Sequence, residues 1–247
     1  MTESKKTPNL EAVNLSVIKG SKQIFSGLNL RLEPGKVIAV IGPNGTGKTS
    51  LLRSLAGLDR STLHSVVLGG RPLFSYSERE RSTLMSWLPA HHDIYLPIKA
   101  MELVVWGRYP LHQGLPSKID IEAAEAALTQ TGALGLGSRN IASLSSGERQ
   151  KVFLARALAG RAAVYLADEP CSHLDTGAGI KTMRIFNGLA SSGNLVCVSL
   201  HDLTLIRNFT QEFVAISPTR PPIHGPISNL SLSMIEDLYE IRGLKNI

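Results

Sequence analysis

The sequence has few cysteines, few aromatic residues and no long apolar run. Only two of the 247 residues are cysteine, Cys171 and Cys197, and aromatic residues make up 5%. Two cysteines cannot build the disulfide framework of a small secreted domain, and neither lies in a pattern typical of a metal site. No apolar run approaches bilayer-spanning length, and Met1 to Lys6 lack the apolar segment of a signal peptide. We therefore expect a cytosolic protein that reaches a membrane only through a partner.

Basic side chains are in modest excess. Lys and Arg number 26 against 20 Asp and Glu, which gives a formal net charge of +6. A positive charge of this size is compatible with binding to nucleic acid, with binding to an anionic membrane face, or with an ordinary solvated surface that binds neither. The sequence has no block of basic residues with interleaved aromatics, so we expect no nucleic-acid binding. It also has no internal repeat, and its length allows a sizeable core.

The stretch Gly42–Thr49, with the sequence GPNGTGKT, fits the phosphate-loop pattern G-x-x-x-x-G-K-[ST] at every fixed position. The β-branched run Val37–Ile41 precedes it. Leucines at helical spacing follow it, at Leu51, Leu52, Leu55 and Leu58. Strand, loop and helix thus come in the order that phosphate binding requires. The alternative is a glycine-rich turn that binds nothing, which the full match in this context disfavours.

Each residue type in this loop has a physical role in holding a triphosphate. Glycines permit positive φ and lack a Cβ, so consecutive backbone N–H groups can surround phosphate oxygens. The helix that begins near Lys48 adds its positive end, and Lys48 would lie along the β- and γ-phosphates. The Thr49 hydroxyl is placed to ligate Mg²⁺. We predict that the nucleotide is bound by Gly42, Pro43, Asn44, Gly45, Thr46, Gly47, Lys48, Thr49 and Ser50.

The remaining pattern predicts an α/β fold. Strands are expected at 10–18, 24–32, 37–41, 66–68, 84–88, 162–167, 195–200 and 213–216, and helices at 77–83, 98–106, 119–131, 145–159, 180–189 and 231–239. The first two strands form an antiparallel lead-in to a parallel core. We predict a single domain over 8–244, with a P-loop NTPase core at 8–88 and 160–244 and a helical subdomain inserted at 89–159.

Two acids and a histidine follow apolar strands of this core. Asp168 and Glu169 come directly after the strand at 162–167, where Asp168 can hold the Mg²⁺ shell and Glu169 can polarise the attacking water. An exposed start of a loop is the alternative for such a pair. His201 follows the strand at 195–200 and could donate a hydrogen bond to the γ-phosphate. Taken alone, it would be an ordinary loop residue.

The segment Leu144–Gln150, with the sequence LSSGERQ, begins a predicted helix. Ser145 and Glu148 fit an [ST]-x-x-[DE] capping box. A capped helix start that contains a small residue and Gly147 is also an anion-binding end, so capping and ligand binding are compatible.

This segment resembles the LSGGQ signature of ATP-binding cassette (ABC) ATPases, with Ser146 in place of the first glycine. The phosphate loop resembles Walker A, and the strand ending in Asp168-Glu169 resembles Walker B. Ser172–Asp175 resembles the D-loop and Leu200–Leu203 the H-loop, so the resemblance covers nearly the whole chain in the family's order. It implies the ABC ATPase fold with a RecA-like core.

The resemblance also implies a head-to-tail homodimer that sandwiches two ATP molecules. Ser145, Ser146 and Gly147 of one subunit would close on the γ-phosphate held by Lys48 of the other. Glu148 and Asp175 would belong to the nucleotide-binding residues as well. In this family, the opening and closing of the dimer drives a membrane permease.

Two positions depart from the family pattern. Ala90 stands where the Q-loop glutamine is expected, so a methyl group replaces a Mg²⁺ ligand and γ-phosphate sensor. Lys19 falls near the position of the aromatic residue that stacks on adenine, and lysine cannot stack. Such stacking is worth about 1–3 kcal/mol, by analogy with base–aromatic contacts in nucleic-acid binding.

The segments 88–92 (LPAHH) and 105–110 (VWGRYP) resemble the LPQHH and GRxP segments of ABC ATPases that serve bacterial importers of iron chelates, haem and cobalamin. This implies an ATP-hydrolysing subunit at the cytoplasmic face of the cell membrane, which grips a permease around Pro89–Arg108 and serves a solute-binding protein indirectly. One alternative is a soluble ABC protein that acts in cluster assembly or on nucleic acid. Another is a monomeric P-loop kinase or GTPase. The second would lack the segment Leu144–Gln150.

Overall fold

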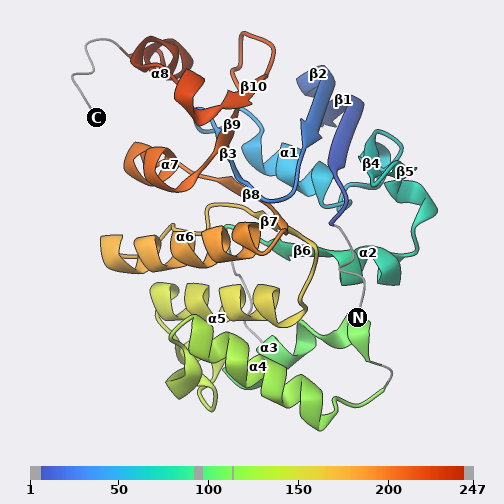
Figure 1. The fold of residues 1–247 in the computed structure, drawn as a ribbon, viewed down its shortest axis with the longest axis vertical. Coiled ribbons are helices and arrows are strands. Elements are labelled where there is room, and N and C mark those ends of the chain that lie inside the picture. Colours follow the sequence, from blue (N-terminus) through green and yellow to red (C-terminus); the bar gives the residue numbers. More distant parts are fainter. Residues whose placement is uncertain (1–6, 92–96, 113, 242–247) are drawn as a thin grey trace.

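A computed structural model describes residues 7–91, 97–112 and 114–241, which form two sheets and the helices around them (Figure 1). The strands are β1 (Leu10–Lys19), β2 (Lys22–Leu32), β3 (Val37–Ile41), β4 (Val66–Leu68), β5 (Arg71–Pro72), β6 (Met85–Leu88), β7 (Val164–Ala167), β8 (Leu195–Ser199), β9 (Glu212–Ala215) and β10 (Ile223–Pro226). The α-helices are α1 (Lys48–Leu55), α2 (Glu78–Leu84), α3 (Ala100–Trp106), α4 (Lys118–Gln130), α5 (Ser146–Ala159), α6 (Thr176–Ser191), α7 (Leu203–Phe209) and α8 (Leu232–Tyr239).

The larger sheet has six strands in the order β10-β9-β3-β8-β7-β6, and all neighbours except β10 and β9 are parallel. Every residue of β3, β7 and β8 is buried, as expected for parallel strands covered on both faces. Side chains alternate between two cores: Val37 and Ala39 of β3 face one, and Ile38 and Val40 face the other. Because the strands are parallel, their carboxyl ends meet at one edge of the sheet.

The smaller sheet is antiparallel and has the order β2-β1-β4-β5, with Leu10 opposite Leu32 at one end of the β1–β2 pair. Its apolar face packs on α1, whose Leu51, Leu52 and Leu55 are completely buried. The helix therefore lies between the two sheets. This packing fixes the direction in which α1 leaves the phosphate loop.

A block of three helices, α3, α4 and α5, covers the other core (Figure 1). A buried ion pair ties these helices together: Arg108 Nε lies 2.7 Å from Asp120 Oδ1 at the start of α4, and Arg108 Nη1 donates to the carbonyl of Ala159 at 2.8 Å. Hydrogen bonds from Ser117 and then Arg108 hold the pKa of Asp120 well below its usual range. The pair therefore stays ionised at neutral pH.

Most described strands and helices agree with the predicted ones, and the differences are the short strand β5, which was not predicted, and three elements in the last third of the chain. Helix α6 begins at Thr176, four residues before the predicted start, because Asp175 caps it by accepting from the N–H of Ala178. Helix α7 and strand β10 were not predicted. The first is only seven residues long, and the second is an edge strand with exposed side chains and no apolar alternation. No helix among the described residues has the length and apolarity needed to cross a membrane.

The close approach of α3 and α5 generates a stability prediction. A Cβ added to Gly107, at the end of α3, would lie 2.2 Å from the carbonyl oxygen of Arg156 in α5. We expect Gly107→Ala to lower the free energy of unfolding by about 1–3 kcal/mol, as overpacking does, measured by urea denaturation. In the control Gly188→Ala, the added Cβ meets no atom within 4 Å, and the gain in helix propensity should stabilise α6 by about 0.5–1 kcal/mol. A Gly107→Ala protein as stable as the parent would contradict this packing.

Candidate nucleotide-binding site

The phosphate loop joins the carboxyl end of β3 to α1 in a conformation that requires glycine. Gly42 and Gly47 have φ values of 145° and 107°. A Cβ at Gly42 would lie 2.2 Å from the carbonyl oxygen of Ile216, and one at Gly47 would lie 2.3 Å from the side chain of Ile24. Both glycines are therefore needed for their backbone angles and for the close approach of neighbouring segments.

Lys48 is buried although it carries a charge. Its Nζ donates to the carbonyl oxygens of Gly42, at 2.7 Å, and Pro43, at 2.9 Å. Burial lowers the pKa of Lys48, an effect that the charges of Glu169 and Asp168 oppose. The loop thus curls around its own lysine, and two carboxylates face the same cation.

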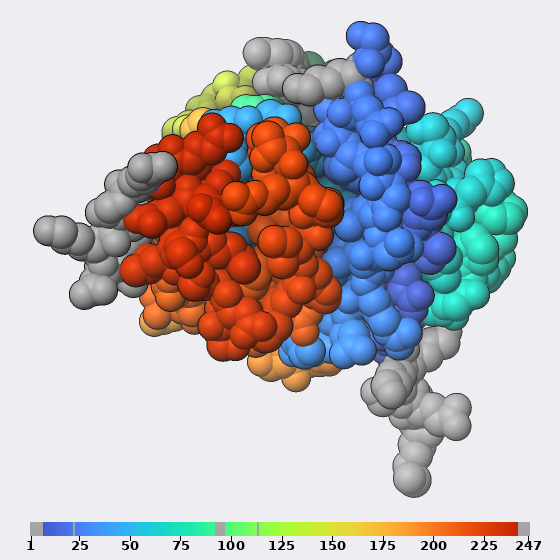
Figure 2. Space-filling model, turned by 90° about the horizontal axis from the view of Figure 1, so that it is seen from above, coloured from blue at the N-terminus to red at the C-terminus, as the bar shows by residue number. Residues whose placement is uncertain are grey.

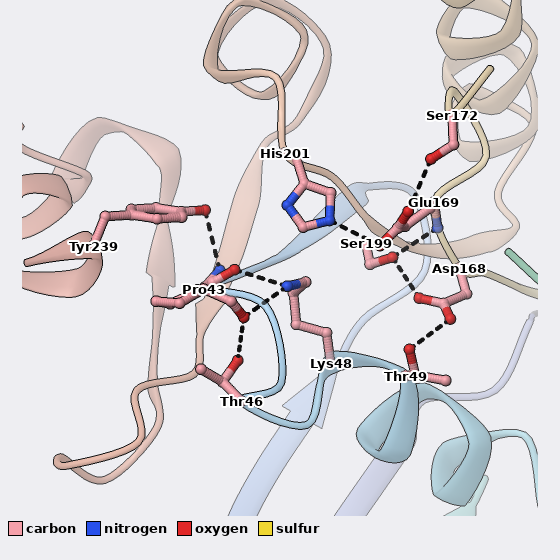
Figure 3. A network of polar contacts seen from close by, with 11 residues as sticks. Pro43, Thr46, Lys48, Thr49, Asp168, Glu169, Ser172, Ser199, His201 and Tyr239 are labelled. Carbon is pink, nitrogen blue, oxygen red and sulfur yellow. Dashed lines mark hydrogen bonds and ion pairs between the residues drawn. The ribbon is translucent and has the colours of Figure 1, made fainter. Parts of the chain in front are cut away.

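Asp168 follows β7 and lies beside the first turn of α1 (Figure 3). Its Oδ2 accepts from the Thr49 hydroxyl at 2.7 Å, and its Oδ1 accepts from the Ser199 hydroxyl at 2.6 Å. A carboxylate and a hydroxyl in contact are hard oxygen ligands of the kind that Mg²⁺ takes. The donor set that the structure brings together therefore fits Mg²⁺.

Glu169 points its carboxylate at a serine and a histidine (Figure 3). Oε2 accepts from the Ser172 hydroxyl at 2.9 Å, and Oε1 lies 2.8 Å from Nε2 of His201. Burial raises the pKa of Glu169, but the hydrogen bonds from His201 and Ser172, with the charge of Lys48, outweigh it and leave the pKa below the ordinary value. Glu169 is therefore ionised at neutral pH, which a proton acceptor requires.

The signature segment lies apart from this network. Ser145 caps α5: its hydroxyl accepts from the N–H of Glu148 at 3.3 Å, and the carboxylate of Glu148 accepts from the N–H of Ser145 at 2.9 Å. The expected capping box is thus present. Arg139 pairs with Glu148 at 3.0 Å, and no hydrogen bond among the described residues joins residues 145–148 to the phosphate loop.

The signature helix and the D-loop are nevertheless attached to the acidic end of β7. The side-chain amide of Gln150 donates to the carbonyl of Pro170 at 2.9 Å, directly after Glu169. Asp175 lines a cavity of about 200 Å³ together with Glu169 and His201. The first residue of the D-loop, Ser172, also donates to the carboxylate of Glu169, so both segments lie next to this acid.

The two departures from the family pattern lie outside the polar network. Lys19 is exposed at the end of β1, and Ala90 is half-buried after β6. His91 is exposed, while His92, in the segment at 88–92, lies outside the described residues. No side chain that can stack on a base is found at position 19.

Three residues of the network were not predicted to belong to the site, and Ser172 is one of them, although it lies in the predicted D-loop. Ser199 is hidden in an apolar strand, where a serine gives no signal. Tyr239 lies at the end of α8, yet its hydroxyl accepts a hydrogen bond from the N–H of Gly42 at 3.3 Å. Figure 2 shows the C-terminal segments, in orange and red, beside the blue N-terminal strands. The last helix thus reaches the first glycine of the phosphate loop.

The fold and this network define a P-loop NTPase. The sequence pattern of the ABC transporter family matches residues 25–172. The chain is 32% identical over 242 residues to the hemin import ATP-binding protein HmuV of Myxococcus xanthus, covering 95% of this chain and 91% of that protein. It is 31% identical over 235 residues to the cobalamin import ATP-binding protein BtuD of Halobacterium salinarum, covering 94% of this chain and 59% of that protein. The chain belongs to the ABC transporter family and is an ATP-binding, ATP-hydrolysing subunit.

Solved structures confirm the predicted fold. A metal-chelate type ABC transporter in an inward-facing conformation has a TM-score of 0.79 at 24% identity, covering 94% of this chain and 88% of that chain. A dimeric ATP-binding cassette in a post-hydrolysis state, bound to ADP and Pi, has a TM-score of 0.77 at 20% identity, covering 88% of this chain and 98% of that chain. The P-loop NTPase core with its antiparallel sheet is thus the ABC ATPase fold. The kinase or GTPase alternative is wrong because the chain belongs to the ABC transporter family.

The contact of Tyr239 with the phosphate loop leads to a prediction for nucleotide affinity. Tyr239→Phe removes only the hydroxyl and leaves the N–H of Gly42 without its acceptor, at a cost of roughly 1 kcal/mol. If the loop then shifts from its binding geometry, the Kd for ATP rises about fivefold, measurable by titration calorimetry. The matched control is Tyr76→Phe, whose hydroxyl donates to the carbonyl of Leu68 away from the loop. Equal ATP affinity in both variants would contradict a role for Tyr239.

Proposed function

We propose that this chain drives the import of a small solute, a haem, cobalamin or iron chelate, by hydrolysing ATP on the cytoplasmic side of a membrane permease. The observation that carries hydrolysis is the connected set of Lys48, Thr49, Asp168, Glu169 and His201 at one edge of the parallel sheet. The cargo class is supported by the names of the hemin and cobalamin import relatives and by the segments at 88–92 and 105–110.

The nucleotide would be held by the predicted loop, residues 42–50. Its backbone N–H groups and the ammonium of Lys48 bind the phosphates, because these positively charged donors all lie where β3 meets the start of α1. Mg²⁺ would be held by the Thr49 hydroxyl and the Asp168 carboxylate, and when bound it neutralises phosphate charge. Each of these residues acts by binding and orientation.

Glu169 would accept the proton of the attacking water. Its carboxylate is ionised at neutral pH and is held from both sides, by Ser172 and by His201. His201 would orient Glu169 and present its ring toward the γ-phosphate. Attack on the γ-phosphorus then breaks its bond to the bridging oxygen and yields ADP and phosphate.

The signature residues would complete the site of a second copy. Ser145, Ser146, Gly147 and Glu148 lie at the start of α5, and the contacts of Ser145 and Glu148 remain within their own segment and Arg139. The positive end of such a helix suits the γ-phosphate of a partner subunit. ATP would then bind the closed dimer more tightly than the open one, and loss of the γ-phosphate would release it.

The permease would dock in a groove between the core and the helical block. This groove has a volume of about 480 Å³ and is lined by Leu58, Trp87, Trp106 and Pro110, among others. Trp106 is 49% exposed and Tyr109, beside it, is 70% exposed. Apolar and aromatic side chains at the surface mark protein contacts. Trp106 and Gly107, at the end of the segment Pro89–Arg108 expected to bind the permease, line this groove. A solute-binding protein would act through the permease.

The role of Glu169 can be tested by removing its charge. Glu169→Gln should bind ATP as the parent does, while the hydrolysis rate falls about 10²–10⁴-fold because the proton acceptor is lost. With Mg-ATP, this variant should also accumulate as a dimer, seen by analytical ultracentrifugation. The control Glu122→Gln changes an exposed carboxylate of α4 and should hydrolyse ATP normally. Parent-level hydrolysis by Glu169→Gln would refute the assignment of the base.

The transport function can be tested by purifying the tagged protein from its native membrane. We expect an integral-membrane permease to come with it, and Trp106→Ala to reduce the amount recovered at least severalfold while ATP binding is unchanged. The control Ile223→Ala removes a similarly exposed apolar side chain, 42% exposed on β10, and should keep the permease. Recovery of a soluble partner alone would favour cluster assembly or nucleic-acid work instead.

A further inference from the structure

We propose that Ser199 is a positioning residue for ATP hydrolysis, which locks the carboxylate of Asp168 and the backbone of Glu169 into one unit. This proposal rests on the roles proposed above for these two acids. Ser199 is the last residue of β8, and it lies beside the end of β7 because the two strands are parallel, with Ala167 opposite Val198. Its side chain is completely buried.

The hydroxyl of Ser199 is both a donor and an acceptor: it bonds to the carboxylate of Asp168 and to the backbone N–H of Glu169 (Figure 3). It donates its proton to Oδ1 of Asp168 at 2.6 Å and accepts the N–H of Glu169 at 2.7 Å. Because a hydroxyl has a single proton, the direction of both bonds is fixed: the carboxylate can only accept, and the N–H can only donate. One side chain thus fixes two neighbouring residues at once.

The backbone of Glu169 needs such support. Its φ is 47°, in the left-handed region that a residue with a long side chain rarely adopts. Conformations of this kind cost about 1–3 kcal/mol and persist where the surroundings hold them. The bond from Glu169 N–H to Ser199 is such a restraint. In this backbone conformation the carboxylate of Glu169 lies against Ser172 and His201.

The same hydroxyl orients the acid that would hold the metal. With Oδ1 of Asp168 bonded to Ser199, Oδ2 faces the Thr49 hydroxyl. The carboxylate plane is therefore set from the neighbouring strand and does not depend on a bound ion. Partners of this kind, which touch a ligating group without touching the metal, typically change metal affinity or activity by about 10–100-fold when removed.

A purely structural serine would behave differently. If Ser199 only satisfied buried polar groups, its loss would lower stability and leave the metal dependence and the turnover number of the folded protein unchanged. A positioning residue changes turnover and the Mg²⁺ requirement together, whereas the affinity for the nucleotide, which the phosphate loop provides, changes little.

Ser199→Ala is the main test. We expect kcat to fall about 10–100-fold and the Mg²⁺ concentration for half-maximal activity to rise severalfold, with the KM for ATP within about twofold of the parent. Without metal or nucleotide, the amide of Glu169 should exchange faster in Ser199→Ala than in the parent, measured by NMR. Ser199→Thr keeps the hydroxyl and should recover most of the turnover. Parent-like turnover and Mg²⁺ dependence in folded Ser199→Ala would overturn the proposal.

Two further measurements distinguish a positioning role of Ser199 from a general effect of changing a buried residue. Cys197→Ala changes another completely buried residue of β8 without touching either acid, and should keep the Mg²⁺ dependence of the parent even if its stability drops. In the parent, the amide of Glu169 should be protected from exchange, and rapid exchange there would contradict the proposal even if Ser199→Ala does not fold. The exchange measurement needs no hydrolysis, so it remains decisive if the proposed role of Glu169 fails.

Discussion

The parallel alignment of β3, β7 and β8 is the constraint on which the site depends. Both faces of these strands are buried, so their interiors accept only apolar or fully hydrogen-bonded side chains. Charged groups are therefore confined to the strand ends. Because parallel strands end at the same edge, the phosphate loop, the two acids and His201 meet there although they are far apart in sequence.

The charges at this edge stabilise one another. Desolvation works against the cation of Lys48 and against the anion of Glu169, yet each lies near the opposite charge. The hydroxyls of Thr49, Ser172 and Ser199 supply the remaining hydrogen bonds of the carboxylates. A network in which each buried group has a partner keeps its geometry without a ligand, so less reorganisation is left for the binding step.

Much of the fold and most residues of the network could be predicted, because their signals are local. The phosphate loop is a continuous sequence pattern between a strand and a helix. Asp168 and Glu169 are recognisable because they directly follow an apolar run. Ser199 and Tyr239 have no such signal. The first is a small residue in a buried strand, and the second bonds to Gly42 across 197 positions of sequence. Contacts of this kind arise only from strand order and from the docking of α8, which no local pattern encodes.

The departures at positions 19 and 90 leave the phosphate-binding groups as the main features of the proposed nucleotide site. Stacking on adenine is worth about 1–3 kcal/mol, and the exposed Lys19 does not supply it. The groups gathered at the edge of the sheet, by contrast, are a buried ammonium, backbone N–H donors, a metal-binding carboxylate and a proton acceptor, all suited to phosphate chemistry. Ala90, which is half-buried after β6, has no side-chain group that can bind a phosphate or a metal ion. If the proposed site binds ATP as described, these groups therefore favour recognition of the triphosphate over recognition of the base.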